Sequence, residues 1–82
     1  MPTVLRLRGL RVVMYPNDHR PAHVHAISAT GEAVFLLNCP DGPPTLRESA
    51  GFNDPDLNRI EAELVGVLAR LCAEWRAPHG RY

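Results

Sequence analysis

The last third of this 82-residue chain carries apolar side chains at the spacing of an α-helix. An apolar residue recurs mostly at every third or fourth position, which is typical of a helix with one buried face. The residues of this stripe are Leu57, Ile60, Leu64, Val67, Leu68, Leu71 and Trp75. Asn53 or Asp54 is the expected N-cap, and Pro55 fits the first helical position. The helix should end near Ala77, before Pro78. About 22 residues rise about 33 Å, enough to cover one face of a small sheet.

The chain before this helix alternates apolar and polar residues, which is the pattern of β-strands. Runs 4–8 and 10–15 show this pattern, and three more runs bounded by turn residues complete the expected strands: 23–29, 32–38 and, as a short edge strand, 45–49. We therefore predict a single domain over residues 1–82 of the α+β class, an antiparallel meander of four to five strands packed against one long C-terminal helix. The expected core residues of the sheet are Leu5, Leu7, Leu10, Val12, Met14, Val24, Phe35 and Leu37.

Composition excludes several classes of protein. No apolar run approaches the ~18 residues that a membrane span needs, so no transmembrane helix is predicted. The N-terminus lacks a long apolar region behind a basic start, so the default location is the cytoplasm. Cys39 and Cys72 fit neither a CxxC metal motif nor a dense disulfide framework. Cys72 is therefore expected to be a small apolar residue of the helix, and Cys39 to lie in a proline-rich loop.

Charge is unevenly distributed along a chain whose net charge is zero. Residues 1–31 hold four arginines against one acid, whereas residues 32–82 hold five arginines against eight acids. A basic N-terminal part favours an anionic ligand, of which RNA is one candidate, because arginine binds phosphate with two hydrogen bonds. The other interpretation is an ordinary solvated sheet face. The candidate phosphate-binding residues are Arg6, Arg8, Arg11 and Arg20.

Three of the four histidines lie within seven residues, at His19, His23 and His25. His23 and His25 should share one face of their strand, because strand side chains alternate. Asp18 precedes them on the entering turn. Three imidazoles suit a divalent metal such as zinc, and a fourth position from Asp18 or water would give the site of a catalytic metal.

The same cluster also suits chemistry that needs no cofactor. Two histidines on either side of a phosphodiester can divide proton abstraction and proton donation, while arginine stabilises the charge on the phosphate. Tyr15, just before the turn, adds a hydroxyl group. This hypothesis makes His19, His23, His25 and Tyr15 the catalytic residues of a metal-independent ribonuclease.

A structural role is the alternative to both kinds of chemistry. Histidines at a turn often cap backbone groups or pair with a neighbouring acid. For the metal hypothesis, Glu32 and His79 are further candidate metal ligands, although His79 is expected in a disordered tail. If the sheet face opposite the helix exposes its apolar residues, a homodimer or a protein partner should cover it. Those residues are Val13, Tyr15, Val34 and Leu36.

The order of several motifs resembles a small bacterial family, the domain of unknown function DUF4160. The motifs are Met1-Pro2-Thr3-Val4-Leu5-Arg6, Tyr15, Asn17-Asp18-His19, Pro21-x-His23-Val24-His25, Glu32-Ala33-x-Phe35, Gly51-Phe52 and Glu74-Trp75. The resemblance covers nearly the whole chain. It departs at Ala22, where members usually have a second proline, and at the longer proline-rich insert of residues 39–45.

The resemblance implies a cytoplasmic protein that is the toxin of a type II toxin–antitoxin pair, with a small antitoxin-like partner encoded nearby. It also implies that Asp18, His19, His23 and His25 are the functional residues. Many such toxins cleave RNA, so the leading hypothesis is a small ribonuclease. The alternative is a non-catalytic module that binds a metal or a protein partner.

Overall fold

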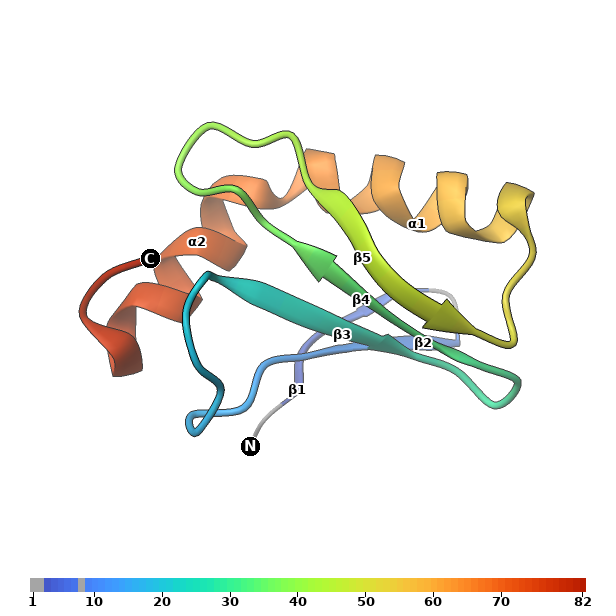
Figure 1. Ribbon diagram of the computed structural model, residues 1–82, viewed down its shortest axis with the longest axis horizontal. Coiled ribbons are helices and arrows are strands. Elements are labelled where there is room, and N and C mark those ends of the chain that lie inside the picture. Colours follow the sequence, from blue (N-terminus) through green and yellow to red (C-terminus); the bar gives the residue numbers. More distant parts are fainter. Residues whose placement is uncertain (1–2, 8) are drawn as a thin grey trace.

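The computed structural model describes residues 3–7 and 9–82. Five strands form one antiparallel sheet in which each strand pairs with the next along the chain (Figure 1). The strands are β1 (Thr3–Leu7), β2 (Leu10–Val13), β3 (His23–Ile27), β4 (Glu32–Leu36) and β5 (Thr45–Ala50). Two helices follow, α1 (Asp54–Gly66) and α2 (Leu68–His79). The predicted α+β class and antiparallel meander are confirmed, with the fifth strand at an edge of the sheet.

A glycine is required where the chain leaves β5 for α1. There the chain passes close to the turn between β3 and β4, in which the Ser28 N–H donates to the carbonyl oxygen of Gly31 at 2.9 Å. A Cβ atom placed on Gly51 would lie 2.1 Å from the carbonyl oxygen of Thr30. Gly51 also has a backbone φ of +87°, which residues other than glycine rarely adopt.

The C-terminal part forms two helices, so the prediction of one long helix is wrong. The start agrees with the sequence: the Asn53 side chain accepts a hydrogen bond from the Asp56 N–H at 2.9 Å. The break lies at Val67, where φ is −125° and ψ is 17°. Gly66 and the β-branched Val67 both have low helix propensity. Neither helix of the described chain has the length and apolarity needed to cross a membrane.

The second helix continues past its predicted end. Pro78 lies within the last turn of α2, and Gly80 ends the helix in a left-handed conformation with φ of 80°. The Gly80 N–H donates to the carbonyl oxygen of Arg76 at 2.7 Å. These two extra residues place His79 within the folded domain, so the prediction of a disordered tail there is wrong.

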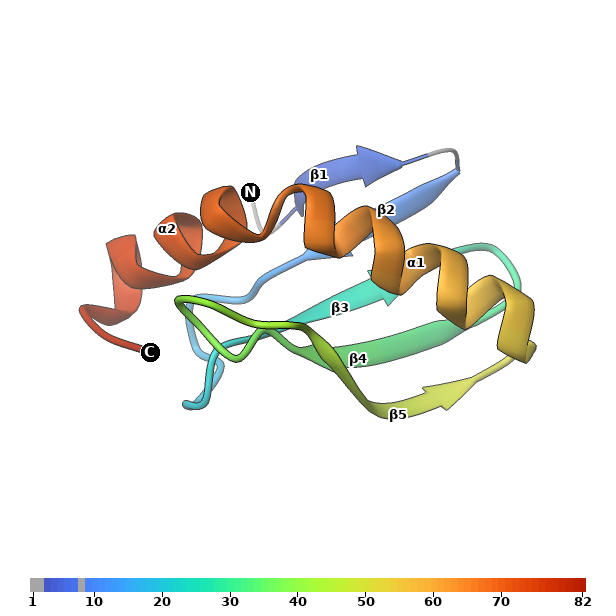
Figure 2. The ribbon, with the colours of Figure 1, turned by 90° about the horizontal axis from the view of Figure 1, so that it is seen from above.

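The core lies between the sheet and the two helices, which cover the same face of the sheet (Figure 2). Buried residues of the sheet and the segments next to it are Leu10, Val12, Met14, Ala22, Val24, Ala26, Ala33, Phe35 and Leu37. The helices contribute Ile60, Leu64, Leu71, Cys72 and Trp75. All eight predicted core residues belong to this core or pack against it; Leu5 and Leu7 are the two that are only partly buried.

A disulfide joins the loop after β4 to α2. Cys39 and Cys72 are bonded, with Cα atoms 5.8 Å apart and a sequence separation of 33. Cys72 is buried as expected, but the expectation that it serves only as a small apolar residue is wrong. The bond holds α2 against the end of the sheet at which β4 finishes and β3 begins.

The opposite face of the sheet is not the apolar surface that a homodimer was expected to cover. Val13 is 1% exposed and Val34 is 8% exposed. Leu36 is half-buried, and only Tyr15 among the four named residues is exposed, at 39%. The premise of the homodimer prediction therefore fails at both valines.

Candidate functional site

The central strand β3 places His23 and His25 on one face, as the alternation predicts. His25 pairs with Val13 of β2 and with Val34 of β4, so neighbouring strands flank it on both sides. The two imidazole rings meet edge to face, with centroids 5.3 Å apart and an angle of 68° between their planes. His23 is buried and His25 is half-buried. A central strand thus holds both rings in a fixed relation.

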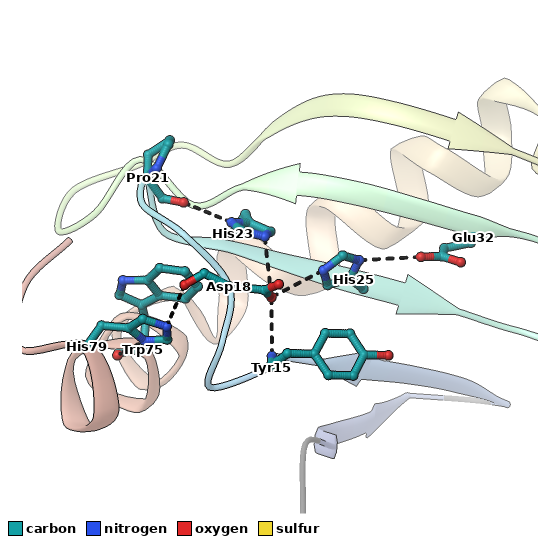
Figure 3. Close-up of polar contacts among 8 residues, drawn as sticks. All are labelled: Tyr15, Asp18, Pro21, His23, His25, Glu32, Trp75 and His79. Carbon is teal, nitrogen blue, oxygen red and sulfur yellow. Dashed lines mark hydrogen bonds and ion pairs between the residues drawn. The ribbon is translucent and has the colours of Figure 1, made fainter.

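The turn before β3 folds the Asp18 carboxylate back onto these rings. The Asp18 N–H donates to the carbonyl oxygen of Tyr15 at 3.0 Å, and the Tyr15 N–H donates to Asp18 Oδ2 at 3.3 Å. The same Oδ2 lies 3.4 Å from Nε2 of His23 and 3.3 Å from Nε2 of His25 (Figure 3). Within residues 3–7 and 9–82, these three side chains bring their ligand atoms within 4.8 Å of one another.

The second nitrogen of each ring also faces an acceptor. His23 Nδ1 lies 2.9 Å from the carbonyl oxygen of Pro21, and because a carbonyl only accepts, Nδ1 is the donor. His25 Nδ1 lies 3.4 Å from Oε2 of Glu32, which is likewise an acceptor (Figure 3). A neutral imidazole that donates from Nδ1 carries a lone pair on Nε2. In that tautomer two lone pairs face one carboxylate oxygen, and a cation between them would satisfy all three atoms; a ring protonated on Nε2 would instead donate a hydrogen bond to Asp18.

Two of the three separations between these ligand atoms suit a metal; the third pair, the two imidazole nitrogens, lies within 4.8 Å and would have to close to about 3.4 Å around an ion. A charge-assisted N–H···O bond is typically about 2.7–2.9 Å long, shorter than either contact with Asp18. Two atoms bound about 2.0–2.2 Å from zinc at a tetrahedral angle lie about 3.3–3.5 Å apart. The contacts of 3.3 and 3.4 Å from Asp18 to the two histidines fall in that range. Three ligands of this kind leave one tetrahedral position for water or substrate.

The end of α2 packs beside His23. Trp75 is fully buried, and its ring centroid lies 5.2 Å from that of His23. The His79 ring stacks on Trp75, with a centroid distance of 3.7 Å and nearly parallel planes. Its nitrogens lie 2.8 Å from the carbonyl oxygen of Trp75 and 3.0 Å from the carbonyl oxygen of Asp18 (Figure 3). His79 therefore connects α2 to the turn that carries Asp18.

Three other candidates from the sequence lie around this group. His19, the expected third imidazole, is exposed and lies outside the group. Tyr15 packs its ring edge-on against His25, with centroids 5.2 Å apart. Glu32 contacts the far nitrogen of His25, where it can orient the ring instead of binding an ion.

The predicted phosphate-binding arginines are divided between the sheet and the loop. Arg6 pairs with Arg11 across β1 and β2, and Arg11 pairs with Ile27 of β3. This register puts Arg11 on the same face as His25, at a diagonal position that is typically about 7–8 Å away between Cα atoms. Arg20 is exposed on the loop before β3, and Arg8 lies outside the described residues.

The sequence predicts Trp75 only as a core residue, and His79 only as part of a disordered tail or as a candidate metal ligand. The signal for their contact is their spacing, because residues four apart lie on the same face of a helix. That spacing predicts the stacked pair if the helix reaches His79. The bond to Asp18 joins positions 61 residues apart and has no local signal.

Comparison with known proteins gives one match. A family model described as a domain of unknown function, DUF4160, matches residues 9–76. The matched range includes Asp18, His23, His25 and Trp75, and it ends before His79. No curated protein and no solved structure matches the chain.

Proposed function

The chain belongs to the DUF4160 family, and we propose that it is a metalloprotein that binds one divalent transition metal through Asp18, His23 and His25. One observation carries the proposal: both Nε2 atoms converge on Asp18 Oδ2 while each Nδ1 faces an acceptor. Histidines that bind metals almost always donate their other N–H to a carbonyl or carboxylate. Imidazole and carboxylate together suit zinc and its neighbours in the first transition row.

An open coordination position would make hydrolysis the chemistry of this centre. When bound with an open position, an ion of this kind polarises a substrate oxygen and lowers the pKa of bound water to about 7. Glu32 would keep His25 in the required tautomer, and the carbonyl of Pro21 would do the same for His23. Trp75 closes one side of His23 to solvent.

Titration of the metal-free protein with Co²⁺ tests the proposal, because Co²⁺ in a four-coordinate site absorbs visible light strongly. We expect saturation at one ion per chain and displacement of Co²⁺ by Zn²⁺. The variants His23→Gln, His25→Gln and Asp18→Asn should each lose the absorption bands. The variant His19→Gln is the matched control, since His19 neighbours Asp18 but lies outside the group. A wild-type protein that shows no bands and retains no ion after gel filtration refutes the metal centre.

The arginines on the same sheet face favour a second candidate, the ribonuclease toxin that the sequence suggests. Arg11 lies one diagonal from His25, and Arg6 faces Arg11 from the next strand, β1, so the two arginines would hold a phosphate beside the histidines. His23 and His25 would then share the proton transfers. A small antitoxin-like partner and a cytoplasmic location belong to this candidate. Thiols are kept reduced in the cytoplasm, so the disulfide between Cys39 and Cys72 would be reduced there.

Expression of the protein in cells and incubation of the purified protein with RNA separate the two candidates. RNA cleavage that persists in EDTA and disappears in the variant His23→Ala, His25→Ala supports metal-free catalysis. Cleavage that EDTA abolishes, and that added Zn²⁺ or Co²⁺ restores, supports a metal-dependent nuclease. Unchanged cell growth together with intact RNA rejects the ribonuclease.

A further inference from the structure

We propose that His79 is a positioning residue for Asp18, and that through it the end of α2 holds the loop carrying this metal ligand. The inference deepens the proposed metal centre and rests on it. The loop of residues 14–22 joins β2 to β3 outside the strand ladders of the sheet. Its position therefore depends on contacts with other parts of the chain.

Three contacts join this loop and the start of β3 to the C-terminal segment. His79 Nε2 lies 3.0 Å from the backbone carbonyl oxygen of Asp18. The N–H of Ala22, at the end of the loop, donates to the carbonyl oxygen of Tyr82 at 3.2 Å. Trp75 packs against the ring of His23, which begins β3. The segment thus touches two of the three ligand residues.

The imidazole ring of His79 is also held in place by contacts with Trp75. Its ring stacks on the fully buried Trp75, and its Nδ1 lies 2.8 Å from the carbonyl oxygen of Trp75. The indole N–H of Trp75 in turn donates to the carbonyl oxygen of Arg81 at 3.1 Å. Both nitrogens face carbonyl oxygens, which only accept, so a neutral ring donates to one of them and a protonated ring to both. The stacking on Trp75 places the ring in either state, so it can fix the position of the group it contacts.

The bond from His79 goes to the backbone of Asp18 and leaves the carboxylate available. Nε2 contacts the carbonyl oxygen, whereas Oδ2 faces the two histidines of β3. His79 can therefore orient Asp18 without competing for its ligand atom. Binding is reciprocal, so an ion held by Asp18 and His23 should also strengthen the docking of residues 75–82.

Two substitutions separate positioning from general stability. His79→Phe keeps a ring that can stack on Trp75 but removes both nitrogens, whereas His79→Gln keeps an N–H donor. Removing a supporting contact around a metal typically weakens affinity about 10–100-fold. We therefore expect His79→Phe to raise the dissociation constant for Co²⁺ by about this factor, and His79→Gln to restore most of the loss. The exposed Glu74, next to Trp75 on α2, offers the control Glu74→Gln, which should bind like wild type.

Amide hydrogen exchange of the metal-free protein gives a second readout. In His79→Phe, exchange should accelerate at the amides of Asp18 and Ala22 and stay unchanged at Val24 and Phe35 in the sheet. If wild type binds Co²⁺ and His79→Phe binds it equally well, the inference is overturned and the metal centre stands. If wild type binds no Co²⁺, the metal centre is refuted, and hydrogen exchange alone decides whether His79 positions the loop. Exchange that stays unchanged in the loop, or that accelerates equally in the sheet, overturns the positioning role.

Discussion

Replacing Cys39 and Cys72 together by alanine should lower the free energy of unfolding by about 3.7 kcal/mol. The disulfide joins positions separated by 33 in sequence. For a closed loop of this length, the chain-entropy relation gives about 12.5 cal/mol/K, which is about 3.7 kcal/mol at 25 °C. Domains of this size are stable by about 5–15 kcal/mol, so the bond accounts for a large share of the total. Alanine is preferred over serine because Cys72 is buried, and a hydroxyl there would need a hydrogen-bond partner.

Urea denaturation followed by the fluorescence of Trp75, the one tryptophan, measures this difference. Four samples are compared: wild type and the double variant, each with and without a thiol reductant. Reduction should bring wild type to the stability of the variant, and it should leave the variant unchanged. At about 4–8 °C per kcal/mol, the melting temperature should fall by roughly 15–30 °C.

Two results would refute this reasoning. The first is a difference below about 1 kcal/mol between oxidised wild type and the variant, since loop closure would then contribute little. The second is the presence of two reactive thiols in unfolded wild-type protein prepared under oxidising conditions. That result would mean that Cys39 and Cys72 do not pair.

Three further predictions concern single substitutions and the tryptophan. Gly51→Ala should destabilise the protein by about 1–3 kcal/mol in thermal denaturation, because it combines a positive φ with a backbone clash; Gly66→Ala, where an added Cβ meets nothing within 4 Å, should be neutral or stabilising. Co²⁺ should quench the fluorescence of Trp75 at one ion per chain while Zn²⁺ does not, and unquenched fluorescence would place the ion elsewhere. Leu64→Ala, at a fully buried position, should cost about 2–5 kcal/mol in urea denaturation; Val65→Ala, beside it and exposed, should change stability by less than about 0.5 kcal/mol.

Much of the fold can be predicted from the sequence because its strongest signals are local. Period-two alternation and the turn residues between runs predict the strands, and a helical stripe after Asn53 predicts the helical layer. The break at Val67 escapes prediction because it interrupts the helix backbone while apolar residues continue on both sides. The disulfide escapes because Cys39 and Cys72 are brought together only when α2 packs beside the end of β4.

The candidate site divides in the same way. Strand alternation alone predicts that His23 and His25 share a face. The return of the Asp18 carboxylate to those rings depends on how its turn closes onto Tyr15, and the sequence shows only that a turn is there. The contact with His79 requires the helix to continue past Pro78 and the tail to reach the loop. Both depend on tertiary packing, which leaves no periodic pattern in the sequence.

The central place of β3 in the sheet has a consequence for how fast an ion could leave. His23 and His25 belong to a strand hydrogen-bonded on both sides, so moving them apart requires the sheet to open. Asp18 lies on a loop, and loops move on timescales far shorter than unfolding. Of the three ligands, Asp18 would therefore detach first, while the two histidines retain the ion as a pair. Release would need loop opening and then dissociation from the two histidines, and the ion could be exchanged many times while the sheet stays closed.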